Sequence, residues 1–545
     1  MSNEHCDPTG KTPPSPELRA RVRTWLAADP DPTTRDELKQ LIACNDGDAM
    51  ADRFDTALSF GTAGLRGALG AGPNRMNRVV VAHASAGLAS YLRDAVGEHA
   101  LVVIGRDART NSDVFAEDAA RVFAGSGCAV LLIPEAVPTP VLAFAVRHLG
   151  AAAGVMVTAS HNPAGDNGYK VYLGGADDGA QIVSPTDAQI FERIIAARAV
   201  RFNDLPRGNF GYTEDSLIEA YVNSTAAVAP ATPGPFPRVA YTPLHGVGHK
   251  TVTRVLNRAG YPQPSVVGIQ AEPDPAFPTV AFPNPEEDGA LDELLAHGRS
   301  TRADLLLAND PDADRLAACI PDGDSYRMLT GNELGALLGW WVAERASAAG
   351  RSGSFATTFV SAPALERIAA HYGFACARTP SGFKWIGRVP TLRFGYEEAL
   401  GYLVNPETIH DKDGISALVA VLSLATDLHR QGSTIGAKID ELAKQFGGFA
   451  GESFSIRLAS QATVGNLMTT VRNVRPLELD STRLSDVRDY QPETNLVQWL
   501  LEDGAQVLIR PSGTEPKLKI YIYADEQARA ASLATAMRQL ISSLT

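Results

Sequence analysis

Short apolar runs alternate with longer mixed stretches once the chain has passed the glycine-rich segment "GTAGLRGALGAG". Residues 100–105, 128–133 and 153–158 are rich in apolar and β-branched residues, which is typical of buried strands. Residues 114–127 and 139–150 lie between these runs and are predicted to be helices, the first of them closed by glycine. This alternation of strand and helix is typical of a mostly parallel sheet covered by helices.

The alternation begins again after a proline-rich break at residues 231–238. The segments "RVAYTPLHG", "SVVGI" and "ADLLLAND" predict strands, and residues near 247–259 and 288–299 predict the two helices between them. The turn Asp322-Gly323-Asp324 then separates this second run from a third one.

The third run predicts helices at 331–348, 363–371 and 415–430, with strands at "SFATTFV", "FACART" and "TLRFGYEEALGY". The last part of the chain differs, because strands such as "ESFSIRL" and "QVLIRPS" are followed by one helix near 525–542. We therefore predict an α/β protein with three mixed α/β domains of similar topology and a C-terminal α+β domain. The predicted boundaries are 1–205, 206–325, 326–445 and 446–545.

The first 55 residues or so are predicted to be helical. Ser15-Pro16 is a typical helix start, with proline at the first helical position. Thr34 and Glu37 have the spacing of a capping box.

Composition narrows the classes of partner. The 545 residues are 45% hydrophobic and 20% charged, as in ordinary globular proteins. The net charge of -13 argues against nucleic acid or an anionic membrane as the main partner. The five cysteines are far apart without a CxxC pair, so we expect reduced thiols. With a polar N-terminus and no run of membrane-spanning length, we expect a cytoplasmic protein.

Ser160 and His161 follow the predicted strand 153–158 directly. Ligands of open α/β sheets bind outside the carboxyl ends of strands, so Ser160 is a candidate nucleophile or phosphate acceptor. The G-x-S-x-G pattern of serine hydrolases is absent. The alternative is a turn in which serine and asparagine cap the next element.

Asp310, Asp312 and Asp314 follow another buried strand. Three carboxylates so close together repel one another unless a cation holds them, and oxygen ligands suit Mg²⁺ or Ca²⁺. The EF-hand pattern fails, because Arg315 stands where glycine is required. The alternative is a solvated acidic turn.

Three further segments offer groups for a phosphate or a sugar. In "LIRPSGTEPKLKIY", a guanidinium, two hydroxyls and a glycine turn make a candidate phosphate cradle, or alternatively a tight hairpin. Lys384, after Gly382, is a candidate phosphate contact, and Glu397-Glu398 offer acceptors for sugar hydroxyls, although a Glu pair is often a solvated face. Arg66 lies in a glycine-rich loop that lacks the dinucleotide fingerprint.

In this order, "TASHNPAGDNGYK", "NDPDADR", "GYEEALG" and "RPSGTEP" resemble the signature loops of the α-D-phosphohexomutase family, the phosphoglucomutases and phosphomannomutases. "FGTAGLRG", "TPLHGVG" and "FPNPE" fit the family as well. The resemblance covers nearly the whole chain after about residue 55. It implies four domains in a heart-shaped arrangement around a central cleft.

The resemblance also implies roles for individual residues. Ser160 would carry a phosphoryl group, and Mg²⁺ would be held by a phosphoserine oxygen with Asp310, Asp312 and Asp314. The implied catalytic residues are Ser160, His161, Lys170, Arg66 and Arg315. The implied substrate-binding residues are Gly382, Lys384, Glu397, Glu398, Arg510, Ser512, Gly513 and Thr514.

The implied reaction interconverts hexose 1-phosphate and hexose 6-phosphate, of glucose or mannose, with glucose 1,6-bisphosphate or a related bisphosphate as activator. The partners would be sugar phosphates. The runner-up is a phosphopentomutase acting on ribose or deoxyribose phosphates. A serine-dependent phosphatase and a non-catalytic sugar-phosphate sensor are the other classes, and phosphate release or full activity without Ser160 would distinguish them.

Two loops depart from the family pattern. The sugar loop of the family usually reads Glu-x-Ser, whereas here Ala399 replaces the serine, so the hydroxyl that would contact the sugar is missing. The aspartate loop has Pro311 and Ala313 where glycines are common. The Glu-Glu-Ala form, with "NGYKVY" and "SGFKWIG", resembles a subgroup that includes both broad phosphoglucomutases and phosphopentomutases.

Overall fold

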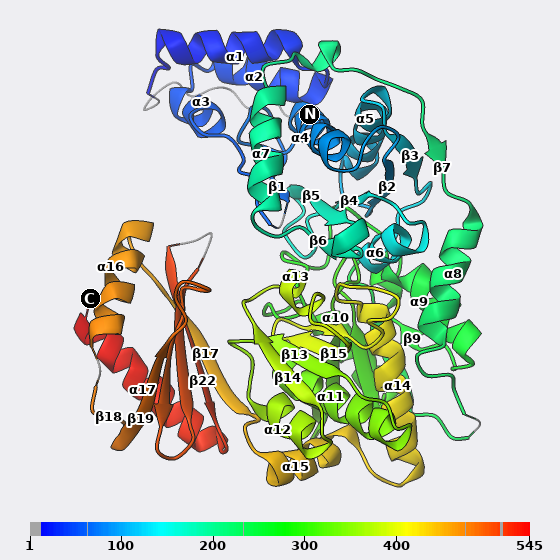
Figure 1. Cartoon of the computed structure of the whole chain (residues 1–545), viewed down its shortest axis with the longest axis vertical. Helices are drawn as coiled ribbons and strands as arrows, with labels where there is room; N and C mark the ends of the chain where they lie inside the picture. Colours follow the sequence, from blue (N-terminus) through cyan, green and yellow to red (C-terminus); the bar gives the residue numbers. More distant parts are fainter. Residues whose placement is uncertain (1–11, 63, 233, 475, 513–515, 545) are drawn as a thin grey trace. The chain divides into compact units, whose positions relative to one another are not determined.

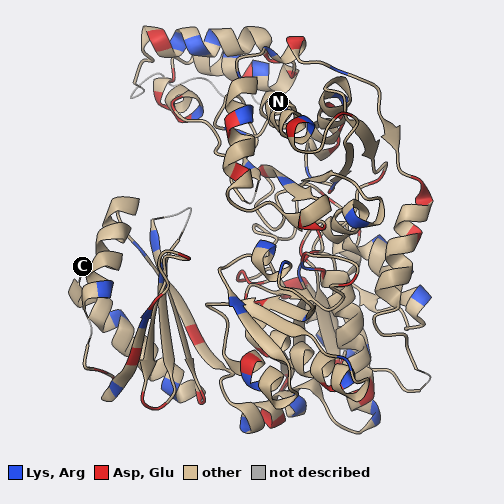
Figure 2. Ribbon diagram, in the orientation of Figure 1, with Lys and Arg blue, Asp and Glu red and all other residues tan. Residues whose placement is uncertain are grey.

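The computed structural model describes residues 12–544 apart from positions 63, 233, 475 and 513–515 (Figure 1). The chain divides into two compact units. Unit 1 runs to Arg327 and also includes Asn405–Ser423, whereas unit 2 comprises Met328–Val404 and the chain from Leu424 onward. Acidic and basic residues are spread over helices and loops of both units (Figure 2).

Three sheets share one strand order, and each belongs to one α/β module. In each module, with strands numbered in chain order, the first strand lies between the second and the third, and both are parallel to it. The third strand also pairs with a fourth strand, which is antiparallel. The four strands of the first module are β2 (Leu101–Arg106), β3 (Ala129–Leu132), β4 (Ala153–Val157) and β5 (Asp166–Leu173). Those of the second are β8 (Val239–Thr242), β9 (Ser265–Val266), β10 (Leu305–Ala308) and β11 (Ala317–Asp322). Those of the third are β13 (Ser354–Thr358), β14 (Ala375–Thr379), β15 (Leu392–Glu397) and β16 (Gly401–Leu403).

Helices connect the parallel strands of each module, as the alternating pattern predicts. They are α5 (Ser112–Gly125) and α6 (Thr139–His148) in the first module, α9 (Gly248–Ala259) and α10 (Asp292–Thr301) in the second, and α12 (Ala364–His371) and α13 (Phe383–Ile386) in the third. The prediction of three mixed α/β domains of similar topology is therefore confirmed.

Short strands extend the first two sheets, and further helices precede or follow the modules. The added strands are β1 (Leu65–Ala68), β6 (Ala180–Gln181), β7 (Gly211–Tyr212) and β12 (Ser325–Met328). The helices are α4 (Arg78–Ala95), α7 (Thr186–Ala197), α8 (Asp215–Ala226), α11 (Gly331–Ala348), α14 (Gly414–Arg430) and α15 (Ile435–Phe446), with single turns at Gly175–Asp177, Phe202–Asp204 and Gly268–Gln270. None of the described helices is long and apolar enough to cross a membrane.

The shared topology puts the predicted functional loops at one equivalent place. In each module that place is the connection between the third, parallel strand and the fourth, antiparallel one. Ser160 lies in the β4–β5 loop, the three aspartates lie in the β10–β11 loop, and Glu398 lies in the β15–β16 loop.

Three N-terminal helices form a small core of their own around Val22, Leu38 and Met50. They are α1 (Pro16–Ala28), α2 (Pro32–Ala43) and α3 (Gly47–Phe54). Ser15 caps α1 as predicted, with its side chain accepting from the amide of Leu18.

The predicted capping box of α2 is wrong. Asp31 is the cap, because its side chain accepts from the amide of Thr33. Thr34 lies inside the helix and donates to Asp29. Glu37 instead accepts from the amide of Ala71. Because Pro32 is well suited to the first helical position, the helix begins two residues before Thr34.

Helix α10 also begins later than predicted, at Asp292 rather than at residue 288. Gly289 has a φ of +81°, which is incompatible with a right-handed helix. By contrast, the bounds of α11 agree with the predicted helix 331–348.

The C-terminal domain is a six-stranded sheet with two helices, so the predicted α+β character is confirmed. Side chains of α16 (Gln461–Asn473) and α17 (Gln527–Leu544) pack around Trp499 in one core. Within unit 2, the Tyr523 hydroxyl donates to the carbonyl of Val360 at 2.6 Å and so ties this domain to the third module. The sheet order is β17 (Ala450–Arg457), β22 (Lys517–Ala524), β21 (Gln506–Pro511), β20 (Val497–Leu501), β19 (Thr482–Asp489) and β18 (Glu478–Leu479), with every pair antiparallel.

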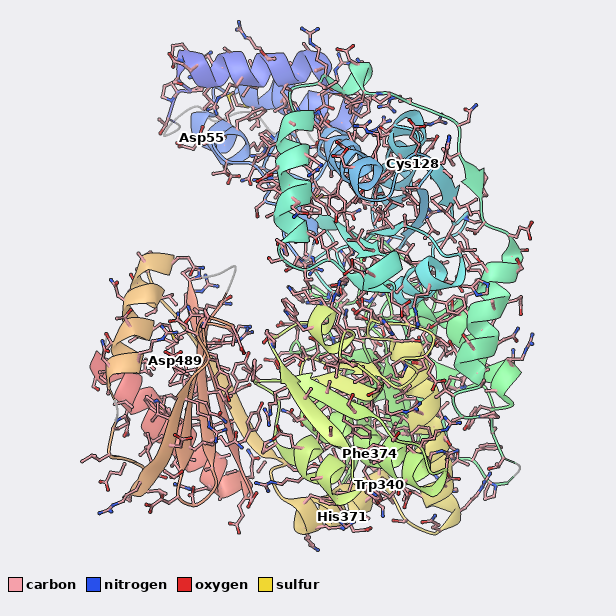
Figure 3. All side chains as sticks on the ribbon, viewed as in Figure 1. Asp55, Cys128, Trp340, His371, Phe374 and Asp489 are labelled. Carbon is pink, nitrogen blue, oxygen red and sulfur yellow. The ribbon has the colours of Figure 1, made fainter. Side chains whose placement is uncertain are left out.

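The cysteines follow the expectation of reduced thiols only in part. Cys128, Cys319 and Cys376 are free, and Cys128 lies just before β3 in the first module (Figure 3). Cys44 is disulfide-bonded, so the expectation is wrong for that residue. Separation along the sequence, on which the expectation rested, does not limit which cysteines meet in the fold.

Two helical glycines of unit 2 test the packing of the third module. A Cβ on the buried Gly335 of α11 would lie 2.3 Å from the ring of Tyr396. A Cβ on the exposed Gly465 of α16 would meet nothing within 4 Å. We expect Gly335→Ala to lower the melting temperature by about 2–6 °C, because overpacking costs about 1–3 kcal/mol.

Gly465→Ala is the matched control and should raise the melting temperature slightly, because alanine is favoured over glycine in a helix by about 1 kcal/mol. Thermal unfolding of the two variants, followed by circular dichroism, measures both shifts. An unchanged or higher melting temperature for Gly335→Ala would contradict the packing of α11 against Tyr396.

Candidate active site

The loop after β4 holds Ser160 in a strained conformation. Ser160 is 3% exposed and has a φ of +55°, in the left-handed region that costs a non-glycine residue about 1–2 kcal/mol. Its amide donates to Thr158 Oγ1 at 2.8 Å. Arg109, from the loop after β2, donates to the carbonyls of Ser160 at 2.6 Å and Asn162 at 2.5 Å. These contacts offset the strain and fix the serine at the strand end.

The Ser160 hydroxyl reaches the aspartate loop of the second module. Its Oγ donates to Asp310 Oδ2 at 3.2 Å and also lies 3.2 Å from His161 Nδ1. The predicted serine and the predicted metal loop therefore meet within unit 1, although 150 residues separate them.

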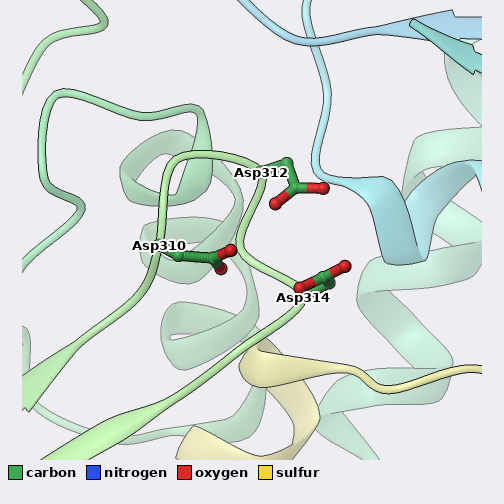
Figure 4. Close-up of side chains that lie close together, drawn as sticks. All are labelled: Asp310, Asp312 and Asp314. Carbon is green, nitrogen blue, oxygen red and sulfur yellow. The ribbon is translucent and has the colours of Figure 1, made fainter. Parts of the chain in front are cut away.

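The carboxyl groups of Asp310, Asp312 and Asp314 converge (Figure 4). All three residues are fully buried, and one oxygen of each lies within 4.8 Å of the others. The Arg315 amide donates to Asp310 Oδ1 at 3.0 Å, and the Thr139 hydroxyl donates to Asp312 Oδ2 at 2.5 Å. A solvated acidic turn is thus ruled out for this loop.

Two lysines compensate the negative charge. Lys170 of β5 places Nζ 2.7 Å from Asp312 Oδ2 and 2.9 Å from Asp314 Oδ2. Lys412 Nζ lies 2.7 Å from the same oxygen of Asp314. These four side chains form a buried network in which both lysines are less than a tenth exposed.

The surroundings shift the pKa values of the three aspartates in different directions. Burial, followed by the charges of Asp312 and Asp314, raises the pKa of Asp310 well above its usual value. Burial alone would also raise the pKa of Asp312, but the charge and hydrogen bond of Lys170 hold it below the usual range. Asp314 is likewise held low against burial, by Lys170 and Lys412.

The cluster fits a divalent cation. Asp312 Oδ1 and Asp314 Oδ1 are buried and have no hydrogen-bond partner among the described residues. An unpaired buried carboxylate oxygen is costly, and hard cations such as Mg²⁺ take such oxygens as ligands. The Ser160 hydroxyl lies next to this cluster, because it contacts Asp310 Oδ2.

Pro311 and Ala313, which stand where the family commonly has glycines, can be placed in the structure of the aspartate loop. Ala313 has a φ of +53°, so it occupies a left-handed position that glycine adopts without strain. A Cβ on Gly246 would lie 2.4 Å from Pro311, so the loop packs closely on the segment after β8. The loop therefore keeps its shape through packing.

The remaining predicted catalytic residues of unit 1 surround Ser160. Arg66 of β1 lies opposite Gly168 in the strand register and donates to Asn162 Oδ1 at 3.1 Å. Arg315 Nη1 lies 3.7 Å from Glu286 Oε2. Burial, followed by the charges of Arg315 and Arg66, holds the pKa of His161 well below its usual value, so the imidazole is neutral near pH 7.

Sequence reasoning missed Lys412 and Arg109. Lys412 belongs to "DKDG", where three charged residues directly precede the long apolar helix α14. Charged residues at a buried helix start are a signal, because they need partners. Arg109 belongs to "GRDAR", at the end of β2, where the strand-end rule applied to Ser160 also points.

The predicted sugar loop lies in unit 2. Glu397 is the last residue of β15, opposite Gly401. Glu398 Oε2 accepts from Thr358 Oγ1 at 2.8 Å and from Ser361 Oγ at 2.9 Å. Its carboxylate therefore helps to hold the loop on the end of β13, a role that the sequence did not reveal.

Lys384 lies in the short helix α13 of the same module. Gly382 precedes this helix with a φ of +112°, where a side chain would be strained. Gly382 thus sets the turn that leads into the Lys384 helix.

The predicted phosphate cradle is described only in part. Arg510 lies at the end of β21, with its guanidinium 5.9 Å from the ring centre of Tyr521. Ser512 is 9% exposed, and its amide donates to the carbonyl of Lys517 at 2.8 Å. Gly513 and Thr514 lie outside the described residues.

The structure thus joins one group of predicted site residues and leaves the others in a separate unit. The group joined in unit 1 comprises Ser160, His161, Lys170, Arg66, Arg315, Asp310, Asp312 and Asp314. Those in unit 2 are Gly382, Lys384, Glu397, Glu398, Arg510 and Ser512.

Comparison with known families gives matches along most of the chain. The matching families are "Phosphoglucomutase/phosphomannomutase, alpha/beta/alpha domain I" over residues 57–201, domain II over 217–323, domain III over 330–446 and the C-terminal domain over 473–540.

Individual relatives agree with this result. The "Probable phosphomannomutase" of Haemophilus influenzae is 46% identical over 82% of this chain and 92% of its own length. The phosphopentomutase of Homo sapiens is 33% identical over 92% of this chain and 91% of its own length.

A solved structure shows the same fold. The phosphoglucomutase/phosphomannomutase family protein of Burkholderia thailandensis superimposes with a TM-score of 0.71 over 89% of this chain and 96% of that one, at 19% identity. With four matching domains in order and a relative of 46% identity, the chain belongs to the phosphoglucomutase/phosphomannomutase family.

Proposed function

We propose that this sugar phosphomutase interconverts hexose 1-phosphate and hexose 6-phosphate, of glucose or mannose, through a phosphoserine at Ser160 and a hexose 1,6-bisphosphate. The observation that carries the proposal is the Ser160 hydroxyl, which lies 3.2 Å from Asp310 in the buried cluster of three aspartates that Lys170 and Lys412 also contact. The 46% identity to a relative named as a phosphomannomutase supports the hexose.

In the first transfer, the bond between phosphorus and Ser160 Oγ breaks and a bond to the substrate hydroxyl oxygen forms. The hydroxyl proton passes to a base, for which Lys170 is the candidate. The bisphosphate then rotates within the site. Ser160 Oγ, which left with the bonding electron pair, forms a bond to the other phosphorus, the bond between that phosphorus and the sugar oxygen breaks, and the sugar oxygen takes the proton back from the base. Because such transfers depend on positioning and charge, the rigid serine loop is suited to both of them.

Mg²⁺ is the proposed metal. Asp310, Asp312 and Asp314 would hold it together with an oxygen of the phosphoserine, and it would neutralise charge on the transferred phosphoryl group. The two buried, unpaired carboxylate oxygens support this assignment.

The other residues have proposed roles around the two phosphates and the sugar. Arg66 and Arg315 would face the transferred phosphoryl group, and neutral His161 would orient the serine loop. Glucose 1,6-bisphosphate or a related bisphosphate would restore phosphoserine when it is lost. The proposed substrate contacts are Gly382, Lys384, Glu397, Glu398, Arg510, Ser512, Gly513 and Thr514.

A phosphopentomutase is the second candidate, and two observations favour it. Ala399 offers no hydroxyl where the family usually has serine, so one expected sugar contact is lost. The human phosphopentomutase matches 92% of this chain at 33% identity.

The proposed reaction can be tested with the substrates themselves. With Mg²⁺ and a trace of glucose 1,6-bisphosphate, the protein should convert glucose 1-phosphate or mannose 1-phosphate to the 6-phosphate, as followed by ³¹P NMR. Ser160→Ala should reduce this conversion below detection, because it removes the hydroxyl that would carry the phosphoryl group. The same assay with ribose 1-phosphate compares kcat/KM for the pentose.

Conversion of ribose 1-phosphate alone would replace the hexose by the pentose. Release of inorganic phosphate faster than isomer formation would indicate a phosphatase. Full activity of Ser160→Ala would contradict the phosphoserine mechanism in either case.

The proposed metal site can be tested through its effect on stability. Mg²⁺ should stabilise the wild-type protein by about 2.7 kcal/mol at a hundredfold excess over its dissociation constant. Asp312→Asn should lose most of this stabilisation, because it removes one of the three charges. The change in melting temperature on adding MgCl₂ measures both.

Asp322→Asn is the matched control, because Asp322 is an exposed aspartate at the end of β11 in the same module. It should respond to Mg²⁺ as the wild type does. A response of Asp312→Asn equal to that of the control would disprove the assignment of the metal to this cluster.

A further inference from the structure

The segment that carries Lys412 is buried although it is highly charged. Asp411 is 1% exposed, Lys412 is 7% exposed and Asp413 is fully buried. Lys412 contacts the metal loop through Asp314, 2.7 Å away. The two flanking aspartates are hydrogen-bonded to side chains outside that loop, because buried carboxylates need partners.

Tyr172 supplies the partner of Asp411. Its hydroxyl donates to Asp411 Oδ2 at 2.7 Å, and Gln181 Nε2 lies 3.1 Å from both the hydroxyl and the carboxylate. Tyr172 stands two residues after Lys170 on β5, so both side chains project from the same face of that strand. One strand face therefore contacts both the metal loop and the segment beside it.

Tyr221 of α8 supplies the partner of Asp413. Its hydroxyl donates to Asp413 Oδ1 at 3.0 Å. The same oxygen accepts from the amides of Ile415 at 2.9 Å and Ser416 at 3.1 Å, so Asp413 also caps the start of α14. Burial, followed by the charge of Asp413, raises the pKa of Tyr221 well above its usual value, which keeps the hydroxyl a donor.

Close backbone packing limits where the segment can lie. A Cβ on Gly414 would be 2.2 Å from the carbonyl oxygen of Arg315, so the chain after Lys412 lies directly on the metal loop. Tyrosines hold the residues before and after Lys412 in the sequence, and the backbone at Gly414 packs against the metal loop. The Lys412 ammonium therefore has little freedom to leave Asp314.

We propose that Tyr172 and Tyr221 are positioning residues that hold Asp411 and Asp413 and thereby fix the Lys412 ammonium on Asp314. Neither tyrosine touches the reacting groups, and each acts through the segment 411–413. Their effect on turnover rests on the proposed function, whereas their effect on the segment does not.

Hydrogen exchange tests the segment independently of activity. In the full-length protein, Tyr172→Phe and Tyr221→Phe should each raise amide exchange in peptides covering residues 409–416 by about tenfold or more, because a buried carboxylate loses its donor. Mass spectrometry of the digested protein measures this rate.

Tyr169→Phe is the matched control. Tyr169 lies on the same strand and is fully buried, but its hydroxyl bonds Ser85 Oγ at 3.0 Å on the opposite face. Its substitution should leave exchange in 409–416 unchanged. Unchanged exchange in both Tyr172→Phe and Tyr221→Phe, or an equal rise in the control, would overturn the proposal. If one of the two variants does not fold, the other decides.

A double-mutant cycle tests whether the tyrosines act through Lys412. Tyr172→Phe should lower kcat by about tenfold in the wild type but change it little in a Lys412→Met background, since coupled residues are not additive. An equal loss in both backgrounds would show that Tyr172 does not act through the lysine. If the wild type converts none of the sugar phosphates, the proposed function fails, and the exchange rates still decide whether the tyrosines hold the segment.

Discussion

The repulsion among three buried carboxylates is the constraint on which the site depends. Like charges a few ångströms apart and away from water cost several kcal/mol unless cations lie beside them. Lys170 and Lys412 supply these cations from the first module and from the segment 405–423, while the aspartates come from the second module. The ion pairs that compensate the three carboxylates therefore connect parts of unit 1 that are far apart in sequence.

The repeated topology explains how such a site is assembled from separate modules. Each module places one of the predicted functional loops after its third strand, where the ends of parallel strands leave backbone and side chains accessible to ligands. The antiparallel fourth strand then returns the chain through the same region. In the first module this return strand is β5, so a single hairpin provides both Ser160 and Lys170.

The sequence was most informative where function depends on local pattern. Buried strands that end in Ser160 or in three aspartates identify their loops without a structure, and these loops do meet. The partner of Lys412 and the scaffold role of Glu398 were not predictable in this way, because a local pattern does not show contacts with residues about 98 and 40 positions away. Local pattern also failed at Thr34, where the alternative cap Asp31 with Pro32 forms a better helix start.

The choice of sugar depends on contacts of a different kind. A site that hydrogen-bonds a substrate hydroxyl rejects the analogue without it by roughly 10⁴–10⁵, since its polar groups are then left unpaired, whereas an apolar contact discriminates by only roughly 10–200-fold. Glu398 already accepts from Thr358 and Ser361, and Ala399 has no hydroxyl to offer. The proposed sugar loop would thus have fewer groups that an incorrect sugar leaves unpaired, and it would favour a broader choice between hexose and pentose than a Glu-x-Ser loop allows.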